Sequence, residues 1–315
     1  MNELKNGVDL IVILGPTASG KTKLATELAY ILDGEIISAD SRQVYKGMDL
    51  GTGKDLQEYT LRGTTIPYHL IDIREAGEKY NVYEFQTDFY KAFQAIKGRG
   101  KIAILCGGTG MYIEAVLRQY KLITVPSNPP LRESLSNKTL PELTDILKQY
   151  KTLHNTTETD TIKRAIRAIE IADYYSKNDE IIVDLPPINP IIFGVNIDRD
   201  IRREKTTKRL KERLDKGMIE EVKQLLKHVS ADDLIYYGLE YKYLTQHAIG
   251  QLSYDEMFEQ LNIAIHQFAK RQMTWFRKME REGTQINWID AQLAMEKKIE
   301  LIAAKIGLPL QSKNE

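Results

Sequence analysis

The sequence predicts an α/β protein in which helices flank a parallel β-sheet and the chain carries a small helical insertion. Three observations lead to this prediction. Short β-branched runs alternate with helical patterns through the first 120 residues, as in βαβ units. A glycine-rich turn follows the first apolar run. Between residues 125 and 190 short helical patterns bounded by prolines replace the alternation, so we expect a core domain of residues 1–124 and 191–315 around an insertion of residues 125–190.

Four apolar runs are the expected strands of the sheet. In the first part of the chain they are Leu10–Leu14, Glu35–Ser38 and Lys101–Cys106. Runs of this length, rich in β-branched residues, are typical of strands. The run Ile191–Asp198 follows the insertion, and we expect it to return to the same sheet.

Helical spacing predicts three longer helices. The first follows the glycine-rich turn and ends at Asp33-Gly34. The second begins after Asn81, an N-cap residue with Glu84 three positions later, and runs to about Lys97. The strongest late helix spans Tyr254 to about Met279, and the chain after the fourth strand is otherwise mostly helical.

Composition excludes several classes of protein. The formal net charge is zero, which argues against a protein that coats nucleic acid. The lone cysteine, Cys106, excludes an internal disulfide framework, and five scattered histidines form no zinc motif. Neither a run of about 18 apolar residues nor a secretory signal is present. We therefore expect a cytoplasmic protein without a membrane partner, and nothing in the sequence indicates a stable protein partner.

The glycine-rich turn matches the P-loop pattern G-x-x-x-x-G-K-[ST]. It follows an apolar strand and opens a helix, which is the context that the pattern requires. Backbone N–H groups freed by the glycines can wrap a phosphate, Lys21 supplies positive charge, and the Thr22 hydroxyl can ligate Mg²⁺. The pattern predicts a P-loop NTPase-like sheet and a diphosphate or triphosphate site at Gly15, Pro16, Thr17, Ala18, Ser19, Gly20, Lys21 and Thr22.

Asp40 and Ser41 come directly after the second expected strand. The carboxyl ends of parallel strands are where ligand sites form in α/β proteins. A carboxylate at this place can ligate Mg²⁺ through water or accept a proton from an amine or hydroxyl group. It can also simply cap the following turn.

The third strand ends in Gly107-Gly108-Thr109-Gly110. A hydrolytic P-loop enzyme would carry a magnesium-binding aspartate there, so the ATPase interpretation is weakened. A hydroxyl flanked by glycines can approach a phosphate oxygen closely. The same residues would also suit a tight turn before a helix.

Two further features allow two interpretations each. Basic residues outnumber acidic ones in Arg199–Arg213, which indicates either contacts with nucleic-acid phosphates or a solvated helix face. Trp275 and Phe276 are able to stack on bases, but an aromatic pair on an amphipathic helix is more often part of the core.

Six blocks of the sequence together resemble the tRNA dimethylallyltransferase family. They occur in the family's order and cover most of the chain, and the combination of DSRQVYKGMD with GGTG behind a P-loop is highly specific. The blocks are GPTASGKT, SADSRQVYKGMDLGTGK, PYHLIDI, GGTGMYIEAV, RAIRAIEI and AKRQMTWFRKM.

The resemblance implies transfer of a dimethylallyl group from dimethylallyl diphosphate to the exocyclic N6 amine of an adenosine. That adenosine lies 3′-adjacent to the anticodon in tRNAs that read codons starting with U. The P-loop would hold the diphosphate, with Mg²⁺ as cofactor. Asp40 matches the general base, Thr109 matches a threonine at the diphosphate and the reacting centre, and Arg213 matches an arginine associated with the diphosphate.

The target base must leave the anticodon loop to reach a buried donor. The resemblance implies that Asp40, Ser41, Arg42 and Gln43 line the channel that receives it, with Ser41 and Gln43 reading the base. It also implies that the insertion contacts the tRNA anticodon stem-loop, through Lys163, Arg164, Ala165, Ile166 and Arg167.

Some motifs differ from the usual family pattern. An alanine and a proline usually flank the lysine that stands here in Gly53-Lys54-Asp55, and the late G-Y-K-E motif appears as Gly238–Lys242. His266-Gln267 replaces a usual Thr-Arg, and His154–Asp160 lacks an Asp-Pro step. These segments are expected near RNA, so the differences bear on which tRNAs are chosen more than on the chemistry.

Two other functions are compatible with a P-loop. A small-molecule kinase would use ATP at the P-loop and Asp40 as base toward a hydroxyl. A nucleotide-switched RNA-binding module would hydrolyse or exchange nucleotide without group transfer. Neither gives a role to the DSRQVYKGMD and GGTG blocks, and ligand preference separates both from a prenyltransferase.

Overall fold

The computed structural model describes residues 4–153, 159–178 and 184–308. The chain forms two compact units, of which the larger comprises Met1–Tyr120 with Pro186–Glu315 and the smaller comprises Lys121–Leu185. The expected insertion of residues 125–190 was therefore placed a few residues late at both ends. Residues 186–190 belong to the larger unit because the Pro186 carbonyl accepts a hydrogen bond from Gln119 and Pro190 begins a strand of the sheet.

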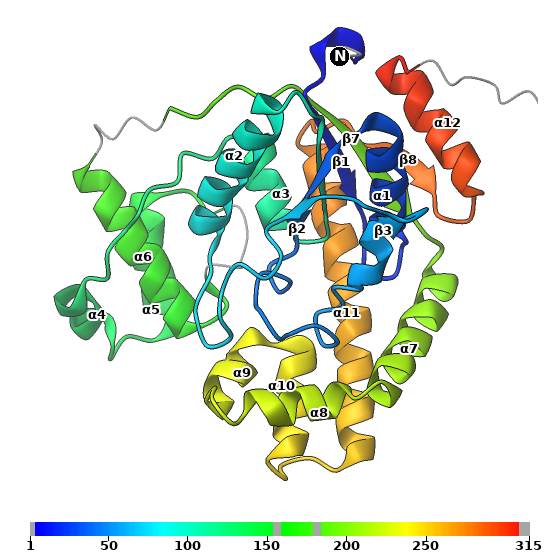
Figure 1. The fold of residues 1–315 in the computed structure, drawn as a ribbon. Helices are drawn as coiled ribbons and strands as arrows, with labels where there is room; N and C mark the ends of the chain where they lie inside the picture. Colours follow the sequence, from blue (N-terminus) through cyan, green and yellow to red (C-terminus); the bar gives the residue numbers. More distant parts are fainter. Residues whose placement is uncertain (1–3, 154–158, 179–183, 309–315) are drawn as a thin grey trace, which may run out of the picture. The chain divides into compact units, whose positions relative to one another are not determined.

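A six-stranded, all-parallel sheet organises the larger unit (Figure 1), in the order β5-β2-β6-β1-β7-β8. All four expected strands are present, and the strand after the insertion pairs with β1. The edge strands β5 and β8 were not predicted, because they are only two and four residues long. The strands are β1 Leu10–Leu14, β2 Glu35–Ala39, β5 Tyr68–His69, β6 Ala103–Gly107, β7 Pro190–Asn196 and β8 Asn287–Asp290.

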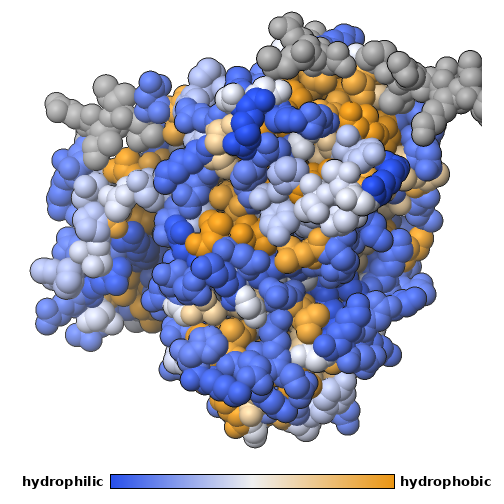
Figure 2. Space-filling view, in the orientation of Figure 1, coloured by the Kyte–Doolittle hydropathy of each residue, from blue (hydrophilic) through white to orange (hydrophobic). Residues whose placement is uncertain are grey.

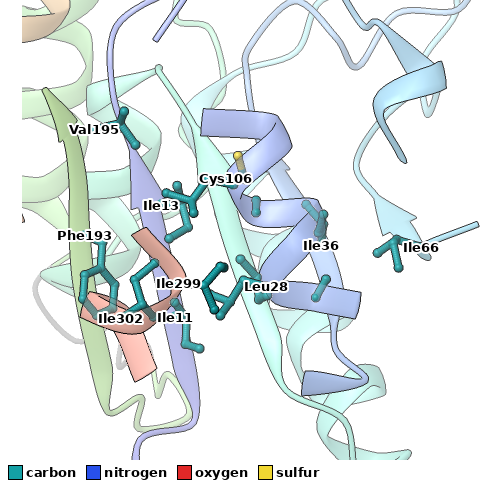
Figure 3. Close-up of a cluster of buried hydrophobic side chains, with 14 of the residues drawn as sticks. Ile11, Ile13, Leu28, Ile36, Ile66, Cys106, Phe193, Val195, Ile299 and Ile302 are labelled. Carbon is teal, nitrogen blue, oxygen red and sulfur yellow. The ribbon is translucent and has the colours of Figure 1, made fainter. Parts of the chain in front are cut away.

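Alternate side chains of the strands enter separate hydrophobic layers. On one face, Ile11 and Ile13 of β1 meet α1 (Lys21–Leu32) and α12 (Met295–Ile306), and Ile299 and Ile302 of α12 point toward the sheet (Figure 3). On the other face lie α2 (Val82–Gly98) and α3 (Gly110–Leu117), joined by Phe85 and Tyr112, whose rings stack at 4.1 Å. Fully burying one aliphatic side chain contributes about 1.5–3 kcal/mol, so these layers hold the strand ends in fixed register.

The helix boundaries follow local capping chemistry. Asn81 caps α2 and forms a capping box with Glu84, as expected. Ser253 forms a capping box with Glu256 at the start of α11 (Tyr254–Arg281), which ends two residues beyond the expected position. Asp33 ends α1 in the left-handed conformation, at φ +52°.

Helices complete the larger unit after β7. In this part α10 packs against α8, α9 and α11. Two 3-10 turns, Lys5–Gly7 and Leu56–Tyr59, and a hairpin of β3 (Thr60–Leu61) and β4 (Thr64–Thr65) lie earlier in the chain. The remaining helices are α7 Arg199–Asp215, α8 Met218–Leu225, α9 Ala231–Tyr237 and α10 Leu239–Ala248.

Most of the face drawn in Figure 2 is hydrophilic, with separate apolar patches. Among the residues that the structure describes, no helix is long and apolar enough to cross a membrane. Many buried apolar residues of the larger unit pack in the layers on either side of the sheet.

The smaller unit is a three-helix assembly with its own core. Its helices are α4 (Pro129–Leu135), α5 (Leu140–Tyr150) and α6 (Ile162–Lys177). Residues at helical spacing from all three helices pack together. Most of the segment that lacks the usual Asp-Pro step, residues 154–158, lies outside the described residues. The buried members of the core are Leu135, Leu143, Leu147, Ala165, Ala168 and Ile169.

Glu170 is the buried carboxylate of this unit. It accepts hydrogen bonds from the Arg132 guanidinium at 2.8 and 3.0 Å, from Arg167 at 2.5 Å and from the Asn128 amide at 2.5 Å. Burial raises the pKa of Glu170, but these donors outweigh it and lower the pKa to about 2. A buried charge with several donors is costly to leave unpaired, so Glu170 ties α4 to α6.

We expect Glu170→Gln to destabilise the smaller unit by roughly 3 kcal/mol, because it removes the charge that both arginines share. Since the pKa of Glu170 is depressed in the folded protein, its contribution is complete above the ordinary value of 4.5 and is lost as pH falls toward about 2. Amide hydrogen exchange of α4–α6 in the full chain measures the effect. Asp145→Asn, at an exposed ion pair with Lys148, is the control, and equal effects of the two variants would contradict the role of Glu170.

Candidate active site

The P-loop, Gly15–Thr22, joins β1 to α1. Ala18 and Gly20 take left-handed backbone conformations, at φ +60° and +81°, and Gly20 is the N-cap of α1. The loop closes so tightly that a Cβ on Gly15 would lie 2.8 Å from Ser19 Oγ. The amino end of α1, with its unpaired N–H groups, therefore lies inside the loop as a site for an anion.

Two side chains of the P-loop, those of Ser19 and Lys21, could bind a polar ligand. Ser19 Oγ is buried and has no hydrogen-bond partner among the described residues. Burial lowers the pKa of Lys21, an effect that Cys106 and Asp40 oppose. Burial also raises the pKa of Cys106 to about 12, so its thiol is not a nucleophile near neutral pH.

The ends of β2 and β6 bring Asp40 and Thr109 to one place. The Ser41 amide donates to Thr109 Oγ1 at 3.1 Å, and the Thr109 amide donates to the Ala39 carbonyl at 3.2 Å. Asp40 Oδ1 accepts the Arg42 amide at 2.9 Å, while Oδ2 accepts no hydrogen bond from any described residue. Thr109 is thus oriented by backbone contacts, and Asp40 keeps one oxygen available as a base.

Glycines allow this close approach. A Cβ on Gly107 would lie 2.3 Å from the Ala39 carbonyl oxygen, and one on Gly110 would lie 2.4 Å from the Trp275 ring. Real Cβ atoms essentially never make contacts this short. The glycines before and after Thr109 are therefore required by packing.

Neighbouring residues of the loop after β2 are already engaged. Gln43 accepts a hydrogen bond from Ser38 Oγ at 3.1 Å and donates to the Gly53 carbonyl at 3.1 Å. The Arg42 guanidinium lies 5.9 Å from the Tyr237 ring centroid, within cation–π range. The Gln43 amide keeps a second N–H and a second oxygen lone pair with which it could contact a base.

Arg213 reaches the site through a cluster that the sequence did not reveal. Arg209 and Arg213 both donate to Asp55 Oδ2, at 2.5 and 3.0 Å, and Arg209 lies 3.5 Å from Thr17 Oγ1. Burial and Arg209 lower the pKa of Arg213, whereas Asp55 raises it. Two guanidinium groups thus stand beside the P-loop, held by one carboxylate.

Arg209 and Arg213 line an open pocket together with Thr17 of the P-loop. Its wall combines the two guanidinium groups with hydroxyl and apolar groups, and Thr206 Oγ1 is buried there without a partner in the described chain. Burial raises the pKa of Glu240, which Arg213 opposes. The lining residues are Thr17, Thr206, Arg209, Leu210, Arg213, Met218, Glu240 and Ile265.

Lys54 anchors the loop that carries Asp55. Its ammonium group is fully buried and donates to the Tyr45 carbonyl at 2.7 Å and to Asp49 at 2.5 Å, and it pairs with Asp72 as well. Every donor of a buried ammonium must be satisfied. The loop after β2 is therefore tied to the loop that contains Asp72.

A carboxylate from α8 fixes the same loop from another side. Glu221 accepts the amides of Asp49, Leu50 and Gly51 at 2.9, 2.7 and 3.0 Å, and the Tyr241 hydroxyl at 2.6 Å. A Cβ on Gly51 would lie 2.5 Å from the Tyr241 ring. Tyr241, part of the altered late motif, thus buttresses the loop after β2.

The segment Lys163–Arg167 presents only part of itself at the surface. Ala165 is fully buried, so its side chain is not exposed for RNA, whereas Ile166 is only partly buried against the core and its contact with RNA stays a prediction. Arg167 donates to Glu170 and, at 2.8 Å, to the Val125 carbonyl. Lys163 and Arg164 are the exposed members, and Arg164 pairs with Asp160.

The structure also bears on the aromatic pair Trp275-Phe276 and on the basic segment Arg199–Arg213. Phe276 is fully buried, as the core interpretation expects. Trp275 lies against Gly110, with Lys278 Nζ 5.1 Å from its ring centroid. Within Arg199–Arg213, Arg209 and Arg213 are engaged beside the P-loop.

Sequence reasoning missed Asp55, Arg209 and Gln272. Gln272 accepts the Thr17 amide at 2.9 Å and donates to the Gly108 carbonyl at 3.0 Å. The available signals were an acid at Asp55, where the family usually has proline, and a glutamine on the apolar side of a long helix. Neither signal identifies the partner residue.

We expect Gly53→Ala to weaken binding of inorganic diphosphate about tenfold or more, an order-of-magnitude expectation for displaced charge-assisted contacts. Gly53 has φ +64°, and its Cβ would lie 1.8 Å from an Arg213 nitrogen, so the guanidinium must move. Gly63→Ala is the matched control, because Gly63 has φ +76° and open space around its Cβ position. Titration calorimetry compares both variants, and equal affinities in the two would contradict the placement of Arg213 at the site.

Comparisons with known proteins identify the family. The family model described as IPP transferase matches residues 43–279, and that described as isopentenyl transferase matches residues 8–74. Proteins named tRNA dimethylallyltransferase 2 from Bacteroides fragilis and Phocaeicola vulgatus are each 62% identical, over 95% and 93% of this chain and 98% and 96% of their own lengths.

Solved structures give the same result. The tRNA isopentenylpyrophosphate transferase of Bacillus halodurans is 30% identical, with a TM-score of 0.69 and 95% of each chain covered. A eukaryotic dimethylallyltransferase acting on tRNA shares the fold, at a TM-score of 0.76 and 21% identity over 97% of this chain and 81% of its own. By sequence and by fold, the chain belongs to the IPP transferase family, the family of the tRNA dimethylallyltransferases.

Proposed function

We propose that this protein transfers a dimethylallyl group from dimethylallyl diphosphate to the N6 amine of the adenosine 3′-adjacent to the anticodon, in tRNAs that read codons starting with U. The observation that carries the proposal is the meeting of Asp40 and Thr109 beside a P-loop, in a chain of this family. A base and a hydroxyl next to an anion cradle suit the departure of a diphosphate, whereas a hydrolytic P-loop enzyme would carry a magnesium-binding aspartate where Gly107–Gly110 stand at the end of β6.

The P-loop would hold the diphosphate of the donor. The P-loop amides that are not already hydrogen-bonded, as Thr17 is to Gln272, would face the anion together with Lys21, and Arg209 and Arg213 would add positive charge from the adjoining pocket. The unpartnered Ser19 hydroxyl and the neighbouring Thr22 fit a hydrated Mg²⁺. Among the described residues no group of three or more His, Cys, Asp or Glu forms a metal cage. When bound, Mg²⁺ would offset charge on the leaving diphosphate, with Thr22 as its protein ligand.

Asp40 would act as the general base. In the transfer, the adenine N6 forms a bond to the first carbon of the prenyl group while that carbon's bond to the diphosphate oxygen breaks. Asp40 Oδ2 accepts the proton from N6, and the diphosphate leaves with its charge held by the P-loop. Thr109, fixed by Ser41 and Ala39, would donate its hydroxyl hydrogen to the diphosphate end of the reacting bond.

The tRNA would supply a flipped base. Asp40, Ser41, Arg42 and Gln43 stand on the loop that would receive the adenine. The exposed Lys163 and Arg164 of α6 would contact phosphates of the anticodon stem-loop. Phosphate contacts of this kind give affinity that falls with rising salt concentration.

The function is tested by incubating the full chain with Mg²⁺, labelled dimethylallyl diphosphate and an anticodon stem-loop that carries an adenosine at the target position. We expect label on the RNA, and none when that adenosine is replaced by guanosine. Absence of label, together with ATP turnover stimulated by a small molecule, would instead establish a P-loop kinase.

We expect Asp40→Asn and Thr109→Ala to lower kcat by about 10²–10⁴-fold, the usual range for removing a general acid or base, with little change in tRNA affinity. Thr109→Ser, which keeps the hydroxyl, and Asp33→Asn, at the exposed end of α1, are the controls. Single-turnover kinetics and RNA binding are measured on each variant. Loss of RNA binding with a normal turnover rate would contradict the assignment of Asp40 as the base and of Thr109 as the hydroxyl donor.

A further inference from the structure

Gln272 on α11 connects the two loops of the site. Its side-chain oxygen accepts the Thr17 amide of the P-loop at 2.9 Å, and its side-chain nitrogen donates to the Gly108 carbonyl of the loop after β6 at 3.0 Å. The residue is 6% exposed. Thr17 and Gly108 are far from Gln272 in sequence, so this side chain forms a direct link between segments that only the fold brings together.

The position of Gln272 in its helix is unusual for a polar residue. Leu261, Ile265, Ala269 and Phe276 on the same side of α11 are all buried. A buried amide lowers stability unless its donor and acceptor are both satisfied. The oxygen of Gln272 faces an N–H group and its nitrogen faces a carbonyl, so only one orientation of the amide satisfies both loops.

The two loops and the helix are closely packed at this contact. A Cβ on Gly108 would lie 2.3 Å from the Gln272 nitrogen and 3.2 Å from the Gly15 carbonyl oxygen. Gly108 directly precedes Thr109, and Gly15 begins the P-loop. The distance between the diphosphate cradle and the Thr109 hydroxyl therefore depends on Gln272 as well as on the pairing of β1 with β6.

We propose that Gln272 is a positioning residue for prenyl transfer: it holds the P-loop and the Thr109 loop at the spacing that aligns the diphosphate with Thr109 and Asp40. This inference rests on the proposed function. Gln272 does not touch the reacting atoms in this role. Its loss would leave the P-loop able to bind the diphosphate, but the P-loop and the Thr109 loop would no longer be aligned. A misplacement of about 1 Å is enough to lower the rate about 10²-fold.

The test compares Gln272→Met and Gln272→Asn with the unaltered chain. Methionine fills a similar volume but makes neither hydrogen bond, and asparagine keeps an amide that is too short to reach both loops. Gln86→Met is the matched control, because Gln86 is also a buried glutamine, 3% exposed, whose nitrogen donates to the Ala115 carbonyl at 2.9 Å. All variants are measured below their unfolding temperatures, and the asparagine variant decides the matter if the methionine variant does not fold.

We expect both Gln272 variants to lower the single-turnover rate of prenyl transfer by about 10–10²-fold, while the affinity for inorganic diphosphate stays within about threefold. The Gln86 variant should transfer at the unaltered rate even where its melting temperature is lower. A Gln272 variant that is less stable but transfers normally would overturn the proposal, because the hydrogen bonds would then be purely structural. So would a loss confined to diphosphate affinity.

The unaltered chain is assayed first. Label transfer by it, combined with normal transfer by the Gln272 variants, contradicts only the role of Gln272. No transfer by the unaltered chain contradicts the proposed function, and with it this role.

Discussion

The close approach of three strand ends is the constraint on which the site depends. The loops after β1, β2 and β6 meet at one edge of the sheet, where the Thr109 amide donates to the Ala39 carbonyl. Gly107 lies so near to that carbonyl that no side chain fits between them. Because the strands are buried in parallel register by layers of helices, the backbone at this edge has little freedom. The active-site side chains inherit their positions from it.

Charge balance is the second condition of the site. Each basic group near the P-loop has an acidic group within interaction range: Asp40 opposes the loss of charge on Lys21, and Asp55 holds both Arg209 and Arg213. A pair of adjacent guanidinium groups would repel without Asp55. The cluster is therefore stable without ligand and still presents donors to an incoming diphosphate. Position 53 must be a glycine, because the Arg213 guanidinium that Asp55 holds occupies the space that an alanine Cβ at this position would fill.

The sequence was sufficient for features that depend on neighbouring residues. The P-loop, the capping box at Asn81 and the four longer strands all follow from local patterns, and the structure has each of them. The very short β5 and β8 carry too few residues for a pattern. Contacts between distant residues were also beyond reach: Gln272 lies 255 positions from Thr17, and Arg209 lies 154 positions from Asp55. Ala165 was assigned with its neighbours, but the helix turns its side chain into the core.

If the protein is a prenyltransferase, its P-loop holds the diphosphate of a prenyl donor and not the triphosphate of ATP. Competition calorimetry with the full chain and Mg²⁺ tests it most directly. We predict that dimethylallyl diphosphate binds, that inorganic diphosphate displaces it, and that ATP at the same concentration neither displaces it nor is hydrolysed. Tight binding of ATP that excludes the prenyl donor would contradict the claim and indicate a nucleotide-dependent enzyme.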